Sequence, residues 1–92
     1  MRVTVRFVSR AREIIGAREE ILEVKIPATV LEILKMLIAK RGSQLKEYLL
    51  EPDSNNPRQH LRFLLNGQSV SPSDVITTGD SVILIFPPVG GG

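Results

Sequence analysis

The group with the clearest chemical potential in this sequence is the carboxylate that follows Gly90-Gly91-Gly92. A carboxylate becomes an acyl donor once its oxygen has been converted into a good leaving group. Glycine suits a chain end that must enter a narrow site, because it lacks Cβ and adopts backbone angles closed to other residues. We therefore expect Gly92 to be the reactive residue, and we expect Gly90 and Gly91 to let the tail enter a narrow site.

Other side chains offer weaker candidates. The sequence contains no cysteine, which excludes disulfides, thiolate metal sites and cysteine nucleophiles. His60 is the single histidine, and with no second ligand near it we interpret it as solvent-facing rather than as a metal ligand or base. Asp74 and Asp80 are typical of turns. Arg12 and Glu13 could pair with each other or with a partner. We expect this chain to bind no metal or cofactor.

Composition narrows the class of protein. Ninety-two residues fit one domain. A net charge of +2, spread-out basic residues and 4% aromatic residues argue against a nucleic-acid surface. No apolar stretch approaches the roughly 18–20 residues that span a bilayer. The first residues already read as a strand, so we expect no signal peptide, no membrane contact and a cytoplasmic location.

Hydrophobic periodicity predicts the elements that must position the chain end. Alternation predicts strands over 2–8, 22–26, 61–65, 68–70 and 81–86, and Asn66-Gly67 is a hairpin turn signal. Helical spacing predicts a long helix over 30–41, which Thr29 and Glu32 begin as a capping box. Shorter helical turns are expected after Ser9 and over 44–50, and an exposed loop over 51–60. This order predicts an α+β domain, 1–86, in which one helix packs across a small mixed sheet of about five strands.

The strand over 81–86 is apolar on both faces, as is typical of a central strand. Ser81 shares its parity with Ile83 and Ile85, which favours Val82, Leu84 and Phe86 as the core-facing set. Ile83 and Ile85 would then join Leu64 in an exposed apolar patch, or be covered by a neighbouring element.

Residues 87–92 are expected to form a flexible tail on a stiff stem. Two consecutive prolines favour an extended, polyproline-like path away from the domain. The four residues after Pro88 reach on the order of 14 Å when extended. The stem either closes the core or docks a partner, and the candidate docking residues are Phe86, Pro87, Pro88 and Val89, although Phe86 is expected to pack inward.

Three stretches resemble a known family. Residues 7–16, which end in Ala11-Arg12-Glu13-Ile14-Ile15-Gly16, resemble the segment that follows the first strand of MoaD-like sulfur carriers. Leu65-Asn66-Gly67, followed by Gly79-Asp80 and an apolar strand, resembles their second half. Phe86-Pro87-Pro88-Val89 before the glycines is the most specific of the three. The chain thus resembles the small subunit of molybdopterin synthase, within the ubiquitin-like β-grasp superfamily.

The resemblance implies a sulfur-carrying co-substrate and not an enzyme. An E1-like adenylating enzyme would use ATP and Mg²⁺ to convert the Gly92 carboxylate into an acyl-adenylate. A sulfur donor protein would then displace AMP and leave a thiocarboxylate. The large synthase subunit, in a heterotetramer, would use that sulfur to build the dithiolene of the molybdenum or tungsten cofactor.

Two departures from the family pattern leave the pathway open. Gly90 adds a third glycine, and the loop over 52–59 is longer than in compact members. One alternative is a ubiquitin-like modifier joined through Gly92 to lysines of other proteins. Another is a sulfur carrier for tRNA thiolation or for thiamine synthesis, although the double proline argues against thiamine synthesis. The last is an interaction module with an inert tail.

Overall fold

The structure, a computed structural model, describes residues 1–86, apart from the side chains of residues 9–11. The expected tail, including Pro87, Pro88, Val89, Gly90, Gly91 and Gly92, lies outside the described residues. The elements, in chain order, are β1 (Arg2–Phe7), α1 (Ser9–Ile15), β2 (Glu19–Glu23), β3 (Ala28–Thr29), α2 (Val30–Arg41), α3 (Ser43–Leu49), β4 (Arg62–Leu65), β5 (Gln68–Val70), β6 (Val75–Ile76) and β7 (Ser81–Phe86).

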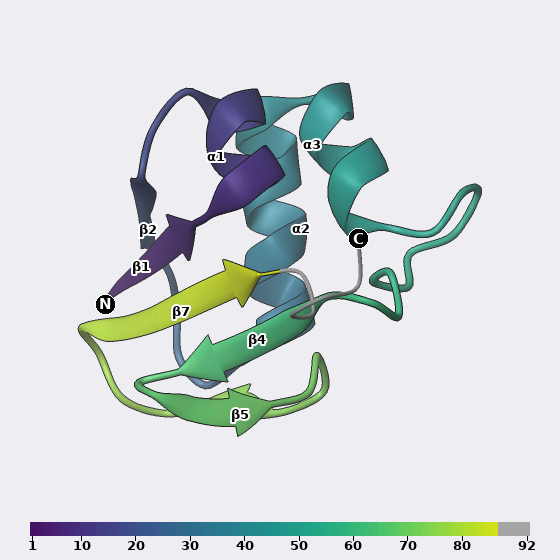
Figure 1. The fold of residues 1–92 in the computed structure, drawn as a ribbon. Coiled ribbons are helices and arrows are strands. Elements are labelled where there is room, and N and C mark those ends of the chain that lie inside the picture. The colour runs from purple at the N-terminus through teal and green to yellow at the C-terminus, as the bar shows by residue number, and fades with distance from the viewer. Residues whose placement is uncertain (87–92) are drawn as a thin grey trace.

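Five strands form one mixed sheet in the order β2-β1-β7-β4-β5. The first and last strands of this sheet along the chain, β1 and β7, pair in parallel at its centre, and the other pairings are antiparallel. Figure 1 shows α2 crossing behind the sheet, with α1 and α3 at one end. The predicted α+β architecture is confirmed, with α1 and α3 as the short helices.

The core lies between α2 and one face of the sheet. The buried side chains of α2 recur at helical spacing, and they are Val30, Ile33, Leu34 and Leu37. Strands β1 and β7 contribute alternate residues to it, among them the fully buried Val3, Val5, Ile83 and Ile85. Leu45 and Leu49 of α3 close one end of this core.

The expected assignment of the two faces of β7 is wrong. Ser81, Ile83 and Ile85 point into the core, whereas Val82, Leu84 and Phe86 are half-buried on the opposite face. The register with β1 places Ile83 beside the buried Val5, so the two side chains share a face. Ser81 is tolerated there because its hydroxyl donates to the Thr78 carbonyl oxygen at 2.7 Å and contacts the Asn66 amide nitrogen at 3.3 Å.

Helix α2 begins as the sequence predicts. The Thr29 hydroxyl accepts a hydrogen bond from the Glu32 backbone N–H, and the Glu32 carboxylate accepts one from the Thr29 N–H, both at 3.1 Å. The first short helix differs in its cap: Val8 is the N-cap and no side chain caps the helix. Gly16 ends α1 with φ of 75°, the left-handed conformation that commonly follows a helix.

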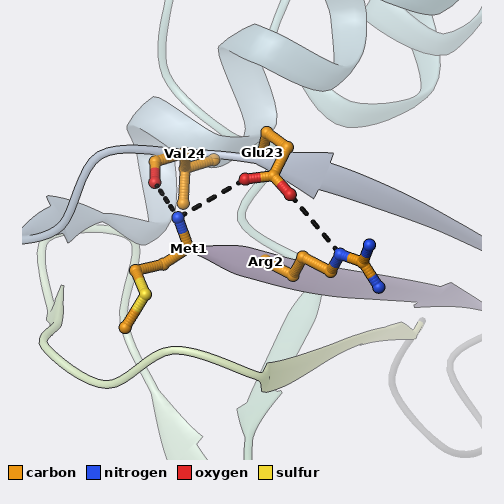
Figure 2. A network of polar contacts seen from close by, with 4 residues as sticks. All are labelled: Met1, Arg2, Glu23 and Val24. Carbon is orange, nitrogen blue, oxygen red and sulfur yellow. Dashed lines mark hydrogen bonds and ion pairs between the residues drawn. The ribbon is translucent and has the colours of Figure 1, made fainter.

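Strand β2 begins earlier than predicted, at Glu19 instead of residue 22. Two of its three acidic residues lie opposite basic residues of β1, with Glu19 beside Arg6 and Glu23 beside Arg2. Opposite charges on facing strands favour this register. At the start of β1 the Met1 amino group donates to the Val24 carbonyl oxygen at 3.0 Å, and the Glu23 carboxylate lies 3.4 Å from both the Met1 nitrogen and Arg2 Nε (Figure 2).

A second, two-stranded sheet was not predicted. Val75 and Ile76 form β6, which pairs with β3 just before α2. Strands of two residues are too short to show an alternating pattern, so hydrophobic periodicity could not have indicated them. Among the helices of residues 1–86, none is long and apolar enough to cross a membrane.

Candidate functional site

The predicted tail continues from the centre of the sheet. Residue 86 is the last of β7, and β7 is held by β1 on one side and by β4 on the other. Phe86 itself pairs with Arg62 of β4. Whatever follows residue 86 is therefore attached to a strand fixed on both edges, so the body and the attachment point move together.

The face of the sheet opposite α2 is the candidate docking surface, and we call it the outer face. Its central row crosses four strands: Arg6 of β1 lies beside Leu84 of β7, which lies beside Leu64 of β4 and then Ser69 of β5. Around this row lie Thr4, Val82, Phe86 and Ile21. Leu64, Val82, Leu84 and Phe86 are each half-buried, and Ile21 is 48% exposed. Apolar side chains thus remain accessible in one contiguous set.

Phe86 is the one predicted docking residue within the described part, and it does not pack inward as expected. Its parity places it on the outer face with Leu84, because the residue between them, Ile85, is fully buried. Leu64 is also on the outer face, as the predicted patch required. Ile83 and Ile85 are not, since both are in the core.

Charged residues border the apolar row. Arg6 Nε lies 3.4 Å from a carboxylate oxygen of Glu19, and these side chains are 59% and 43% exposed. On the other flank Arg62 Nη1 donates to the carbonyl oxygens of Gln59 at 2.9 Å and Leu61 at 3.1 Å. Exposed ion pairs of the Arg6 kind contribute about 0–1 kcal/mol, so Arg6 exchanges partners at little cost.

Two hollows open beside Arg6 and Leu84. One, of about 400 Å³, is also lined by Phe7, Val8, Arg12, Arg18 and Glu19. The other, of about 210 Å³, is also lined by Leu64, Asn66, Gly67 and Val82. Both are shallow surface features and neither is a closed pocket, which suits a docking surface better than a site for a small ligand.

His60, Asp74 and Asp80 lie where the sequence predicts them. His60 is exposed. The Asp74 carboxylate accepts a hydrogen bond from the Ser71 N–H at 2.8 Å and helps to close the turn between these residues, and Asp80 has φ of 58° in a turn. Arg12 and Glu13 are exposed, and residues 1–86 show no ion pair between them. In the described part of the chain no group of three His, Cys, Asp or Glu side chains could hold a metal ion.

Sequence reasoning missed that Val82 and Leu84 are accessible. The alternation in β1 carried a signal, because Arg2, Thr4 and Arg6 alternate with apolar residues and so mark the face of the sheet that lies away from the core. It could have been used only with the knowledge that β1 and β7 pair in parallel, and that pairing joins residues about eighty positions apart.

Known proteins resemble this chain over its whole length. The sequence profile described as "ThiS family" matches residues 5–92. The chain is 34% identical to small archaeal modifier protein 3 of Haloferax volcanii over an alignment 96 positions long, which covers 100% of both sequences. The crystal structure of SAMP1 from Haloferax volcanii superposes with a TM-score of 0.87 at 24% identity, again over 100% of both chains.

A third similarity concerns a structure from Pyrococcus furiosus named "Putative molybdopterin converting factor, subunit 1". It has a TM-score of 0.74 and 27% identity, covering 97% of this chain and 99% of that one. These structures and the strand order together confirm the predicted β-grasp fold.

Proposed function

The chain belongs to the ThiS family of small sulfur carriers, and from that premise we propose that it carries sulfur on the carboxylate of Gly92. In this proposal a partner enzyme transfers AMP from ATP to the carboxylate, with Mg²⁺, and releases pyrophosphate. A sulfur donor protein then delivers sulfide, whose sulfur attacks the acyl carbon and expels AMP. The product is a thiocarboxylate that an acceptor enzyme consumes, so this chain acts as a co-substrate.

The observation that supports this proposal best is the position of β7. A carrier must present one chain end to at least two enzymes in turn, which requires a firm attachment point beside a surface that both enzymes can grip. Strand β7 is fixed on both edges, and its half-buried side chains, Val82, Leu84 and Phe86, lie on the outer face. Gly90 and Gly91 would pass into each active site while the outer face, with Pro87, Pro88 and Val89, remains on the enzyme's surface.

We assign the pterin precursor of the molybdenum or tungsten cofactor as the acceptor, with this chain as the small subunit of molybdopterin synthase. The similarity to the Pyrococcus furiosus protein supports this assignment, as does the Phe86-Pro87-Pro88-Val89 stem. The partners are then an E1-like adenylating enzyme, a sulfur donor protein and the large synthase subunit.

A second candidate function is protein modification through Gly92. The 34% identity to small archaeal modifier protein 3 over the full length favours it specifically. Both functions begin with the same acyl-adenylate. They differ in the nucleophile that displaces AMP, which is sulfur in one and a lysine amine in the other.

Intact-mass measurement of the chain purified from its native cell separates these functions. Replacement of one terminal oxygen by sulfur supports carriage, and Gly92 remnants in isopeptide linkage on other proteins support modification. Co-purification with a larger pterin-binding subunit supports the molybdopterin assignment. If the terminus is always an unmodified carboxylate, and a chain without Gly91 and Gly92 still sustains cofactor synthesis, the proposal is wrong.

A further inference from the structure

Three arginines gather where the tail leaves the domain, and they carry an inference that rests on the proposed function. We propose that Arg6, Arg12 and Arg18 form a cationic corner that docks onto an acidic patch of the enzyme that adenylates Gly92. The corner lies at the end of β1, and it is continuous with the outer face through Arg6 and Leu84.

Backbone contacts hold the three arginines together. Arg6 is on the outer face beside Leu84. The Phe7 N–H donates to the Arg18 carbonyl oxygen at 2.9 Å, which brings residue 18 back to the end of β1. The Gly16 N–H donates to the Arg12 carbonyl oxygen at 2.9 Å and closes α1 just before that return. All three residues line the hollow of about 400 Å³.

The charge of this corner is incompletely compensated. Glu19 is the only carboxylate among the described residues that line the hollow, and its single ion pair is with Arg6. No ion pair within 4.0 Å engages Arg12 or Arg18 in the part of the chain that the structure describes, and both are exposed. Glu13 lines the adjoining hollow of about 480 Å³ together with Arg12 and Arg18. The three arginines of the corner still outnumber the two carboxylates, Glu13 and Glu19, so the net charge of the lining residues is positive.

The other basic residues near the base of the tail and behind the sheet are differently placed. Arg62 donates to two carbonyl oxygens of its own loop. Arg41 and Lys40 surround Glu20 behind the sheet. Among the arginine side chains that the structure describes, Arg12 and Arg18 are therefore the ones best able to meet a partner near residue 86.

The occupant that fits is a protein surface with carboxylates beside an apolar patch. Guanidinium groups are weakly hydrated and match carboxylates with paired N–H groups, so they suit an interface better than ammonium groups do. The hollow is open and partly apolar, with Phe7, Val8 and Leu84 in its lining, and offers no enclosed set of donors for a small anion. The apolar outer face adjoins it, so a partner that covers Leu84 and Leu64 must also meet the corner.

Complementary charge acts chiefly on the rate of encounter and on the choice of partner. Steering of this kind raises association rates by about 10 to 10³-fold and weakens as salt is added. The corner would thus deliver the tail in the correct orientation before Gly92 enters the adenylating site.

The test compares two charge reversals of equal size. The variant Arg12→Glu/Arg18→Glu removes the corner, and the control Lys35→Glu/Lys46→Glu changes residues of α2 and α3, which do not contribute to the outer face. Circular dichroism and thermal melting verify that both fold. The readout is ATP–pyrophosphate exchange by the adenylating enzyme of the same organism, measured against carrier concentration at low and at high salt.

We expect the corner variant to lower kcat/KM about tenfold or more at low salt, within the range known for electrostatic steering. The loss should shrink at high salt, and kcat at saturating carrier should be unchanged. The Lys35→Glu/Lys46→Glu control should stay close to the unmodified chain. Equal losses in the two variants, or inhibition by millimolar inorganic phosphate that disappears in the corner variant, would overturn the docking role. If the unmodified chain supports no exchange at all, the proposed function fails together with this inference.

Discussion

Oε1 of Glu20 lies 2.9 Å from Nε and 2.8 Å from Nη2 of Arg41, so one carboxylate oxygen joins β2 to the last turn of α2. Lys40 Nζ approaches the same oxygen at 3.5 Å. Glu20 is 13% exposed, far less than the other paired carboxylates of residues 1–86, which are at least 39% exposed. Strand β2 is an edge strand, and this contact fastens it to the helix behind the sheet.

Replacing Glu20 with glutamine should lower the free energy of unfolding by about 1–2 kcal/mol, because hydrogen bonds to charged groups contribute more than neutral ones. For a domain of this size each kcal/mol corresponds to about 4–8 °C in Tm. Thermal melting followed by circular dichroism measures the loss. Glu13→Gln is the matched control, since Glu13 is exposed and makes no ion pair within the described residues, and its Tm should not change. Equal Tm values for the two variants would contradict this account.

Alanine substitution of two adjacent residues of β7 should have different effects, because one side chain is in the core and the other is on the outer face. Ile83 is fully buried, so Ile83→Ala should cost about 2–5 kcal/mol by leaving a cavity. Leu84 is half-buried, so Leu84→Ala should cost about 1 kcal/mol or less while weakening adenylation of Gly92. Urea unfolding and ATP–pyrophosphate exchange give the two readouts. The opposite order of stabilities would restore the face assignment that the sequence suggested.

The turn between β4 and β5 should be sensitive to loss of glycine for a conformational reason. Gly67 has φ of 85° and follows Asn66 at φ of 50°, while a Cβ at Gly67 would meet nothing within 4 Å. Gly67→Ala should therefore cost about 1–2 kcal/mol purely through the left-handed backbone. At Gly79, whose φ lies outside this region, a Cβ would come 2.7 Å from Cε of Met1. Met1 is 61% exposed and can move, so Gly79→Ala should cost less. A larger loss at Gly79 in urea unfolding would contradict this reasoning.

The Tyr48 hydroxyl should lose its proton at a higher pH than an exposed tyrosine does. Partial burial disfavours its phenolate and raises the pKa of Tyr48 above the ordinary 10.0. The unfolded chain then loses its proton first, so the stability that Tyr48 contributes is complete below pH 10 and decreases as pH rises through the folded pKa. It is the single tyrosine and there is no tryptophan, so absorbance near 295 nm reports this group alone. The pH at which half of Tyr48 is ionised should be lower in denaturant than in the folded protein. Tyr48→Phe should reduce the loss of Tm at alkaline pH relative to the unmodified chain. A folded midpoint at or below 10.0 would show that the side chain is fully solvated.

Much of the fold could be predicted because local signals agreed with the final structure. Thr29 and Glu32 mark the start of α2, Gly42 its end, and Asn66-Gly67 the hairpin, each through contacts within a few residues. The face assignment of β7 failed for the opposite reason. Ser81 is buried because Thr78 and Asn66 satisfy its hydroxyl, and Asn66 lies fifteen positions away.

The candidate site could be predicted only in part. Leu64 and Phe86 were assigned to it from their apolar character, and both lie on the outer face. Arg6, Arg12 and Arg18 are dispersed in the sequence, and they converge only because α1 returns the chain to the end of β1. From composition alone these arginines belong to the basic residues that are spread along the chain, because no local sequence signal indicates that α1 leads back to the end of β1.

The central place of β7 also bears on when the protein can fold during synthesis. A ribosome produces β1 first and β7 last among the described strands, yet β1 has β7 as its inner neighbour. Until residue 86 has been made, the sheet lacks its central strand, and β2-β1 and β4-β5 are separate halves without the buried Ile83 and Ile85 between them. Long-range parallel pairing of this kind delays folding until its second partner is available. A chain cut short before β7 therefore cannot assemble the outer face, and the activating enzyme would be offered only chains whose C-terminal strand is already in place.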